Sequence, residues 1–319
     1  MQSLPKISPE VKIASAMLAV MFVLSWVYSL PIVIPSGDRA AFVGVHYIYP
    51  LIGIAILGIT TFLAGKREIA TSFFLALPCY VAILFAHFNI KLWIPHINTA
   101  NYDELYWEID KMVRPLVDIC IYIRKDVLFF IPYESNLYML GFIAIFYISF
   151  MYHAIQTPVR FRTLVISVLL LQALGALAYL IAPAIGPFLY ERGVDPTISD
   201  GQSSMLEFYR RSVAEGPGWI AQHGGANFTV GLAAMPSLHA AGAFLFFLFA
   251  WKHGRILLPL YCFILFFILV TSIASRWHYV IDIPVGIALA WACLWIAERI
   301  GARQAVEPHP NPSAVLAPA

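Results

Sequence analysis

The sequence predicts an all-α, polytopic membrane protein, and three observations lead to this fold class. The chain of 319 residues is 61% hydrophobic and only 12% charged, about half the charged share of a typical soluble protein. Its apolar residues gather in runs of about 20, the length that a helix needs to cross the hydrocarbon layer. Several of these runs end at Pro, Gly or a basic pair, which are the usual signals of a turn.

The same composition excludes other classes. A net charge of +2 without a basic run does not suit a nucleic-acid-binding protein. The cysteines lie mostly inside apolar runs without metal-ligand spacing, so we interpret them as packing residues. They are Cys79, Cys120, Cys262 and Cys293.

Eight segments can span the membrane. The first is too long for a signal-peptide core and has no cleavage pattern after it, so we expect an uncleaved span. The sixth is the shortest. The predicted spans lie at about 13–34, 46–65, 69–90, 137–155, 162–182, 236–251, 256–274 and 280–298.

Basic residues predict the orientation. With the N-terminus inside, the short outer loops carry only Arg39 and Arg276, whereas the inner segments carry Lys6, Lys12, Lys66, Arg67, Arg160, Arg162, Lys252, Arg255, Arg299 and Arg303. The positive-inside rule therefore favours a cytoplasmic N-terminus and C-terminus, with the connections 91–136 and 183–235 outside. With no obvious retention signal or lysine-rich tail, a bacterial inner membrane is our expectation.

Both outer connections are expected to fold on the membrane surface. The first predicts an amphipathic helix whose apolar face carries Leu105, Ile109, Val113, Leu116, Val117 and Cys120. The second, with its glycine-rich stretch 216–231, is expected to form a cap. We divide the chain into N-terminal transmembrane helices (1–95), a catalytic domain (96–300) and a disordered tail rich in Pro and Ala (301–319).

Ionisable residues gather at the outer ends of the last three spans. His278 and Asp282 are four residues apart and would share one face of a helix. The carboxylate can fix the imidazole tautomer, which leaves Nε2 as a nucleophile or base. Arg276 beside them suits a phosphoryl group.

A second part of the cluster opens the sixth span. Pro236-Ser237 marks a helix start, where free N–H groups and the helix dipole favour an anion. His239 there could protonate a leaving alkoxide. Each histidine alone reads equally well as an interfacial side chain, and the His–Asp pair as a structural hydrogen bond or half a metal site. Five such groups at one level favour function.

These residues resemble a known family. Pro236-Ser237-Leu238-His239 and the run Ser275–Asp282 are similar to the last two motifs of the type 2 phosphatidic acid phosphatase superfamily. The resemblance implies a six-helix-type phosphatase core and a phosphohistidine on His278 supported by Asp282. It also implies that Arg276 and Ser237 hold phosphate and that His239 serves the leaving group.

Some details resemble one branch of that superfamily. Only Trp277 separates Arg276 from His278, where the common pattern has five residues, and Leu238 replaces a glycine. Both features are similar to the inositol phosphorylceramide synthase and sphingomyelin synthase branch. The segments 182–187 and 102–110 also resemble inositol phosphorylceramide synthases.

The superfamily's first motif, a lysine followed by Arg-Pro, is incomplete. Arg114-Pro115 has Trp107 at the lysine position, with Lys111 nearby, so Arg114 and Lys111 are our candidates for phosphate binding. Arg160 and Arg162 fall on the cytoplasmic side and are excluded. Arg192, Arg210 or Arg211 could supply further charge from the cap.

We therefore expect an enzyme that transfers a phosphoryl or phospho-headgroup unit from a lipid phosphate, to water or to a lipid hydroxyl. No metal or other cofactor is expected, because Arg and His neutralise the transferred charge. The alternative is a transporter or binding protein for anionic headgroups, although no paired repeats support it. Vanadate-dependent halide oxidation uses a similar site, normally on a soluble chain.

Overall fold

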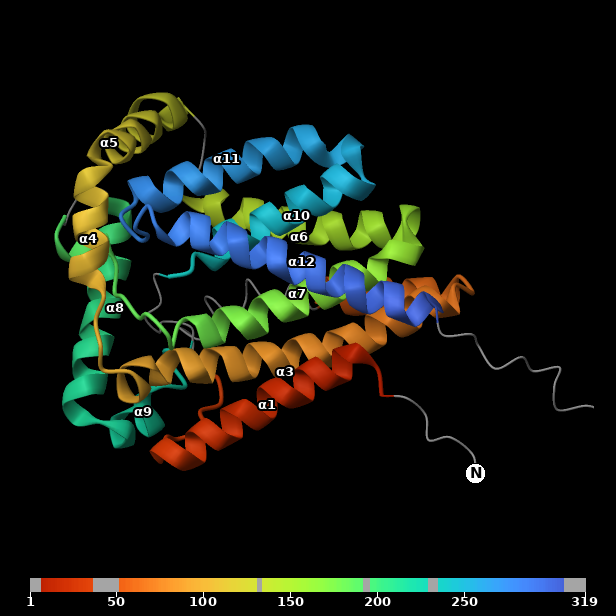
Figure 1. The fold of residues 1–319 in the computed structure, drawn as a ribbon, viewed down its shortest axis with the longest axis horizontal. Coiled ribbons are helices and arrows are strands. Elements are labelled where there is room, and N and C mark those ends of the chain that lie inside the picture. The colour runs from red at the N-terminus through yellow and green to blue at the C-terminus, as the bar shows by residue number, and fades with distance from the viewer. Residues whose placement is uncertain (1–6, 37–51, 131–133, 192–195, 229–234, 307–319) are drawn as a thin grey trace, which may run out of the picture.

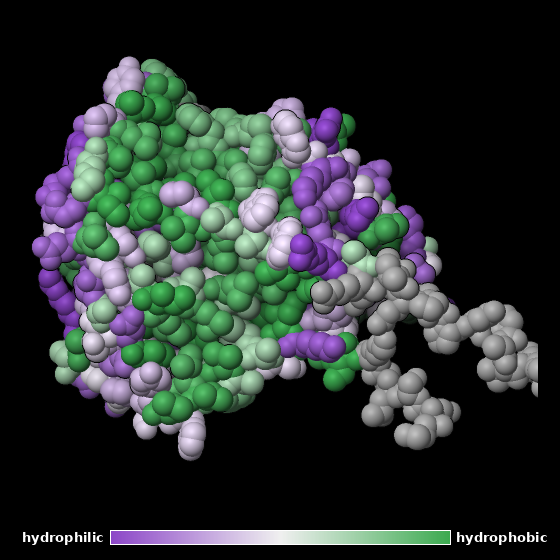
Figure 2. All heavy atoms as spheres, viewed as in Figure 1, coloured by the Kyte–Doolittle hydropathy of each residue, from purple (hydrophilic) through white to green (hydrophobic). Residues whose placement is uncertain are grey.

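A computed structural model describes residues 7–36, 52–130, 134–191, 196–228 and 235–306. Within these ranges the regular elements are all helices, and the long ones form a single bundle (Figure 1). Six helices are long and apolar enough to cross a membrane. Figure 2 shows an apolar belt around the middle of the bundle, with polar residues toward both ends. The prediction of an all-α integral membrane protein is confirmed.

The predicted spans correspond to helices of the bundle. Two of these helices are short, Ile52–Leu63 and α10 (Leu238–His253), and α10 is the predicted short sixth span. Residues 46–51 of the second predicted span lie outside the described residues. The long helices are α1 (Pro9–Tyr28), α3 (Arg67–Ile97), α6 (Glu134–Gln156), α7 (Pro158–Ala178), α11 (Leu258–Ala274) and α12 (Asp282–Val306).

The first helix begins and ends earlier than the predicted span 13–34. The Ser8 hydroxyl caps its first turn, and Ser29 with φ 52° ends it in the left-handed region. Beyond this point the chain is held by α3. The Asn89 side chain accepts from the Val33 N–H at 2.8 Å and donates to the Val33 carbonyl at 3.1 Å. These bonds satisfy an extended backbone that would otherwise be buried without partners.

The last helix is longer than expected. α12 continues to Val306, six residues into the segment predicted as a disordered tail from 301. A side chain at Gly301 would lie only 3.2 Å from Thr163 Oγ1, so α12 and α7 approach closely there and the helix is supported by packing. Residues 307–319 of the predicted tail lie outside the described residues.

Four further helices lie across one end of the bundle, which we call the capped end (Figure 1). They are α4 (Asp103–Met112), α5 (Arg114–Tyr122), α8 (Pro196–Glu215) and α9 (Pro217–His223). Short helical turns follow α5 at Ile123–Val127 and Leu128–Phe130, and others lie at Pro187–Leu189 and Arg255–Leu257. The start of α1, the end of α12 and the turn between α10 and α11 lie at the opposite end. The two long connections therefore fold on the same end, as predicted.

The amphipathic helix predicted for the first connection is confirmed only in its second half, and the segment forms two helices. The buried residues of α5 are Val117 and Cys120, as expected, although Leu116 is exposed. In α4, Leu105 is exposed and the buried positions are Asp103, Tyr106 and Asp110. The apolar pattern is overridden there because the two buried carboxylates accept hydrogen bonds, which offset their loss of water.

Candidate active site

The candidate site lies at the capped end, where three helix ends meet. The loop 275–281 joins α11 to α12, and the first turn of α10 packs beside it. The Ser237 N–H donates to the Asp282 carbonyl at 3.2 Å. A side chain at Gly286 would come within 2.6 Å of the Ser237 carbonyl oxygen, so only glycine allows α12 to approach α10 this closely. The structure thus brings together the two motifs that the sequence singled out.

His278 and Asp282 are paired, but not on a helix face as predicted. α12 begins at Asp282, so His278 lies in the preceding loop, which leaves α11 through the left-handed residue Arg276 (φ 59°). The Asp282 Oδ2 contacts His278 Nδ1 at 3.1 Å and accepts from the Tyr279 N–H at 2.8 Å. Asp282, the first residue of α12, therefore contacts two residues of the preceding loop and fixes their positions.

The environment of this pair suits a nucleophilic imidazole. Asp282 is fully buried, whereas the His278 side chain keeps 11% of its surface exposed. A carboxylate at Nδ1 favours the tautomer that carries the proton on that nitrogen, which leaves the lone pair on Nε2. The pair can therefore supply either a nucleophile or a general base.

The first turn of α10 carries polar atoms to which the described residues offer no partner. Ser237 stands at the N-cap position as predicted, yet its hydroxyl makes no capping bond to the helix. Its Oγ is fully buried, and within the described part of the chain neither this atom nor His239 Nε2 has a hydrogen-bond partner. Buried polar groups are almost always satisfied, so such atoms indicate a place for a missing polar group. The N-terminus of a 16-residue helix favours an anion there.

An aromatic side chain links His239 to the loop 275–281, the candidate catalytic loop. The Tyr138 ring packs 5.2 Å from the His239 ring, and the Tyr138 hydroxyl lies 3.2 Å from Ser272 Oγ. The Ser272 carbonyl accepts from the His278 N–H at 3.3 Å. Phe142 packs on the His239 imidazole at 5.0 Å. Both histidines therefore belong to one packed unit, in which their rings have little freedom to turn.

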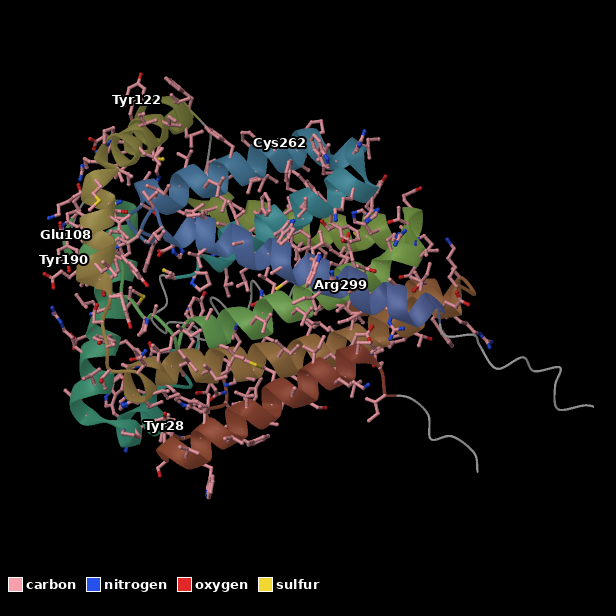
Figure 3. All side chains as sticks on the ribbon, viewed as in Figure 1. Tyr28, Glu108, Tyr122, Tyr190, Cys262 and Arg299 are labelled. Atoms are coloured by element: carbon pink, nitrogen blue, oxygen red, sulfur yellow. The ribbon has the colours of Figure 1, made fainter. Side chains whose placement is uncertain are left out.

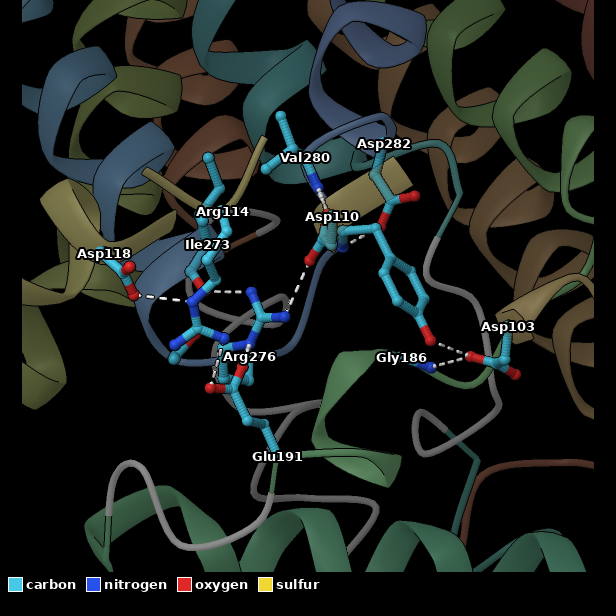
Figure 4. Close-up of polar contacts among 12 residues, drawn as sticks. Asp103, Asp110, Arg114, Asp118, Gly186, Glu191, Ile273, Arg276, Val280 and Asp282 are labelled. Atoms are coloured by element: carbon cyan, nitrogen blue, oxygen red, sulfur yellow. Dashed lines mark hydrogen bonds and ion pairs between the residues drawn. The ribbon is translucent and has the colours of Figure 1, made fainter. Parts of the chain in front are cut away.

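Arg276 is enclosed by carboxylates (Figure 4). It is 1% exposed, its Nη2 donates to Asp110 Oδ2 at 2.7 Å, and its Nε lies 2.9 Å from Glu191 Oε2. Its guanidinium also lies over the Trp107 ring at 5.7 Å. The fork is thus held rigidly but already carries two negative partners, with which a phosphate would compete.

Two aspartates of α4 hold the catalytic loop, and sequence reasoning assigned them no role. Asp110 Oδ1 accepts from the Val280 N–H at 2.8 Å, while its Oδ2 binds Arg276. Asp103 Oδ1 accepts from the Tyr279 hydroxyl at 2.7 Å (Figure 4). Burial and the adjacent Asp103 carboxylate raise the pKa of Tyr279, so its hydroxyl stays protonated and donates. The signal available in the sequence was their spacing of seven residues, which is two helical turns on one face.

The Pro-rich segment before the cap is bonded to the same elements. The N–H groups of Ile185 and Gly186 donate to Asp103 at 2.7 and 2.8 Å. Gly186 has φ 136°, a conformation that only glycine adopts readily. The Phe188 N–H donates to the Arg276 carbonyl at 3.1 Å. This segment and the catalytic loop are therefore joined directly and through α4.

The two predicted phosphate-binding residues of the first connection differ in position. Arg114 Nη1 donates to Glu191 Oε1 at 2.7 Å, so Glu191 bridges Arg114 and Arg276. This bond raises the pKa of Arg114. Lys111 is not brought into the site, because its half-exposed ammonium pairs with Glu108 at 2.6 Å. Figure 3 shows Glu108 at the outer edge of α4.

Two of the other basic candidates are exposed residues of α8. Arg211 is exposed and pairs with Glu215 within α8 at 2.9 Å, and Arg210 is exposed on the same helix. Arg192 lies outside the described residues. Arg162 bonds to Glu10 at 2.6 Å at the opposite end of the bundle, in agreement with its exclusion as a ligand. In the described part of the chain, no group of three His, Cys, Asp or Glu side chains could hold a metal ion.

Comparison with known proteins gives one match. Residues 129–296, just over half of the chain, match the family model of the PAP2 superfamily. The matched segment contains α6, α7, α10, α11 and most of α12, together with the loop 275–281. No curated protein and no solved structure is significantly similar to the chain.

Proposed function

The chain belongs to the PAP2 superfamily, and from this premise we propose that it transfers a phosphoryl or phospho-headgroup unit from a lipid phosphate ester by way of His278. One observation carries the proposal. The His278–Asp282 pair is bonded to the first turn of α10, where Ser237 Oγ and His239 Nε2 are buried without partners among the residues that the structure describes. A phosphoryl group between these atoms would supply both the electrophile and the missing hydrogen-bond partners.

The reaction proceeds in two displacements. His278 Nε2 attacks phosphorus, the P–N bond forms as the P–O bond to the leaving group breaks, and His239 gives the departing alkoxide its proton. The acceptor then loses a proton to His239 as its oxygen attacks the phosphohistidine, and His278 is released. Asp282 stabilises the positive charge that develops on the His278 imidazole. Protons and electron pairs balance over the cycle without a further reactant.

Charge on the phosphoryl oxygens is balanced by Ser237, the α10 N-terminus and Arg276. Arg276 binds the phosphate in place of part of its contact with Asp110 and Glu191, since a phosphate offers more negative charge than either carboxylate. Arg114 contributes indirectly, because its hydrogen bond holds the Glu191 carboxylate in position. Lys111 has no part in this arrangement, because it pairs outside the site.

The acceptor we favour is a lipid hydroxyl, as in the inositol phosphorylceramide synthase and sphingomyelin synthase branch. The short Arg276–His278 spacing supports this acceptor, because it is similar to the spacing in that branch. The left-handed turn at Arg276 accommodates it. Leu238 supports it too: the side chain packs so close to α7 that a Cβ at Gly175 would lie 2.5 Å from Leu238 Cδ2. Water as the acceptor would make the protein a lipid phosphatase.

Phosphorus NMR of the purified protein in detergent tests the proposal. The protein is incubated with a mixed phospholipid extract, with and without added diacylglycerol or ceramide. A new phosphodiester that needs the added lipid identifies a headgroup transferase, and release of inorganic phosphate identifies a phosphatase. No change with any lipid contradicts the proposal and favours a binding protein.

The role of His239 predicts a dependence on the leaving group. His239→Ala is expected to slow turnover of alkyl phosphates by about 100- to 10,000-fold, because their alkoxides need a proton. Para-nitrophenyl phosphate, whose leaving group departs without a proton, should lose much less activity. Turnover numbers for both substrate types measure the difference. An equal loss with both would contradict the role.

We place the site on the periplasmic or lumenal face, in a bacterial inner membrane. The charges support this orientation, because the basic residues at the ends and short turns of the spanning helices lie mainly at the end opposite the capped end. Arg299 of α12 lies toward that end (Figure 3). Further basic residues there include Lys12, Lys66, Arg67, Arg160, Arg162, Lys252 and Arg255. We further propose the division into residues 1–95 and a catalytic unit of residues 96–300.

This orientation predicts which engineered cysteines can be labelled. Gly218 in α9 is exposed, and a Cβ there would meet no atom within 4 Å. Gly218→Cys should therefore react with an impermeant thiol reagent added outside intact cells, whereas Lys66→Cys should react only after lysis. Both variants carry Cys262→Ala, because Cys262 is exposed on α11 (Figure 3) while Cys79, Cys120 and Cys293 are buried. The reverse labelling pattern would invert the topology.

A further inference from the structure

Lys91 is a cation inside the bundle for which the described residues offer no anionic partner. It lies six residues before the end of α3, about 9 Å along the helix from the capped end. In the described part of the chain no carboxylate lies within ion-pair distance of its ammonium, which lies 5.9 Å from the centre of the Tyr179 ring. Its side chain is half-buried.

The helix register places Lys91 beside the first turn of α10. α3 and α7 run side by side in the same direction (Figure 1). His87, one turn before Lys91 on the same face, bonds the Gln172 carbonyl of α7 through Nδ1 at 3.0 Å. Lys91 is therefore level with about residue 176. Leu238 packs against Gly175 at that same level, and His239 follows Leu238 in the chain.

Electrostatics agree with this placement. The Lys91 ammonium lies within electrostatic reach of both the His87 and the His239 imidazoles. A lone ammonium in a low-dielectric interior costs several kcal/mol, whereas a cation–π contact returns about 0.5 to 2 kcal/mol. The balance is unfavourable unless an anion lies beside the ammonium. Lysine and the neighbouring orphaned atoms, Ser237 Oγ and His239 Nε2, all suit a phosphate oxygen.

We infer that Lys91 binds an oxygen of the transferred phosphoryl group, on the side of His239 and the leaving group. Arg276 reaches the group from the opposite side, from the loop before α12. The two cations differ in availability, because Arg276 already has two carboxylates, whereas no carboxylate among the described residues pairs with Lys91. The inference rests on the proposed function for the identity of the ligand, since it concerns the same site.

Binding of inorganic phosphate to the purified full-length protein tests the inference directly. Isothermal titration is carried out on the wild type, Lys91→Met and Lys91→Arg. Lys91→Met is expected to bind phosphate about ten- to a hundredfold more weakly, the effect of losing one charged hydrogen bond. Lys91→Arg keeps the charge and should lose less. The matched control is Lys252→Met, which removes an exposed lysine paired with Glu298 at the opposite end and should bind as the wild type does.

Thermal unfolding separates a ligand effect from a folding defect. At one phosphate concentration, the rise in unfolding temperature should be the same for the wild type and Lys252→Met, and smaller for Lys91→Met. Equal phosphate affinity in the wild type and Lys91→Met would overturn the inference. If Lys91→Met binds phosphate more weakly than the wild type but the wild type turns over no lipid phosphate, the inference is supported and the proposed function is refuted.

Discussion

His278→Ala is expected to lower turnover by about 10,000-fold or more, because it removes the atom that forms the covalent bond to phosphorus. The residual rate comes from binding and from the groups that still stabilise charge. A brief incubation with ³²P-labelled substrate should leave an acid-labile label on the wild-type protein and none on the variant. Turnover and labelling together distinguish a lost nucleophile from a weakened site.

His223→Ala is the matched control for this experiment. His223 lies in α9, where its Nδ1 contacts the Trp219 carbonyl at 3.1 Å and its ring stacks on that indole. The same substitution there should leave both turnover and labelling close to the wild type. A phosphoenzyme label that persists in His278→Ala would assign the nucleophile to another residue and contradict the proposed mechanism.

Asp110→Asn is expected to destabilise the protein by about 3–5 kcal/mol, the range measured when one partner of a buried ion pair is removed. Asp110 and Arg276 are 2% and 1% exposed, so the guanidinium would keep only Glu191. The Val280 N–H could still bond to the new side-chain carbonyl, which isolates the effect of charge. Turnover should fall as well, because Arg276 and the loop 275–281 lose a fixed position.

Two further variants sharpen this prediction. Asp118→Asn removes a carboxylate that is 57% exposed and pairs with Arg114, so its effect on the free energy of unfolding should be below about 1 kcal/mol. The double variant Asp110→Asn with Arg276→Met removes both buried charges, keeps an acceptor for the Val280 N–H and should recover most of the lost stability without recovering turnover. Equal unfolding temperatures for Asp110→Asn and Asp118→Asn would show that the buried pair does not stabilise the fold.

The fold could be predicted from composition and hydropathy, because a bilayer accepts few alternatives to long apolar helices. The predictions were wrong at helix ends that depend on local contacts. Ser29 ends α1 earlier than predicted, and packing at Gly301 extends α12. The His278–Asp282 pairing also followed from the sequence. Its placement in a loop did not, because a separation of four residues is compatible with more than one backbone path.

The rest of the site depends on which charges become buried, and a sequence does not specify this. Asp103 and Asp110 read as the polar side of an amphipathic helix until their partners are known to come from residues about 80 to 170 positions away. Lys91 reads as a lysine near a membrane surface, and only the α3–α7 register reveals its level. Lys111 is the converse case, since nearness in sequence to Arg114 suggested a role that its pairing with Glu108 does not support.

Because α4 is bonded to the loop 275–281, the site cannot be transferred to another protein without α4. The family match begins at residue 129, after α4, so a chain shortened to the matched segment would keep His278 and Asp282 but lose Asp103 and Asp110. Arg276 would lose its closest carboxylate, and the N–H groups of Val280 and Gly186 would lose their acceptors. Grafting the loop onto another scaffold therefore requires the transplanted unit to begin at α4.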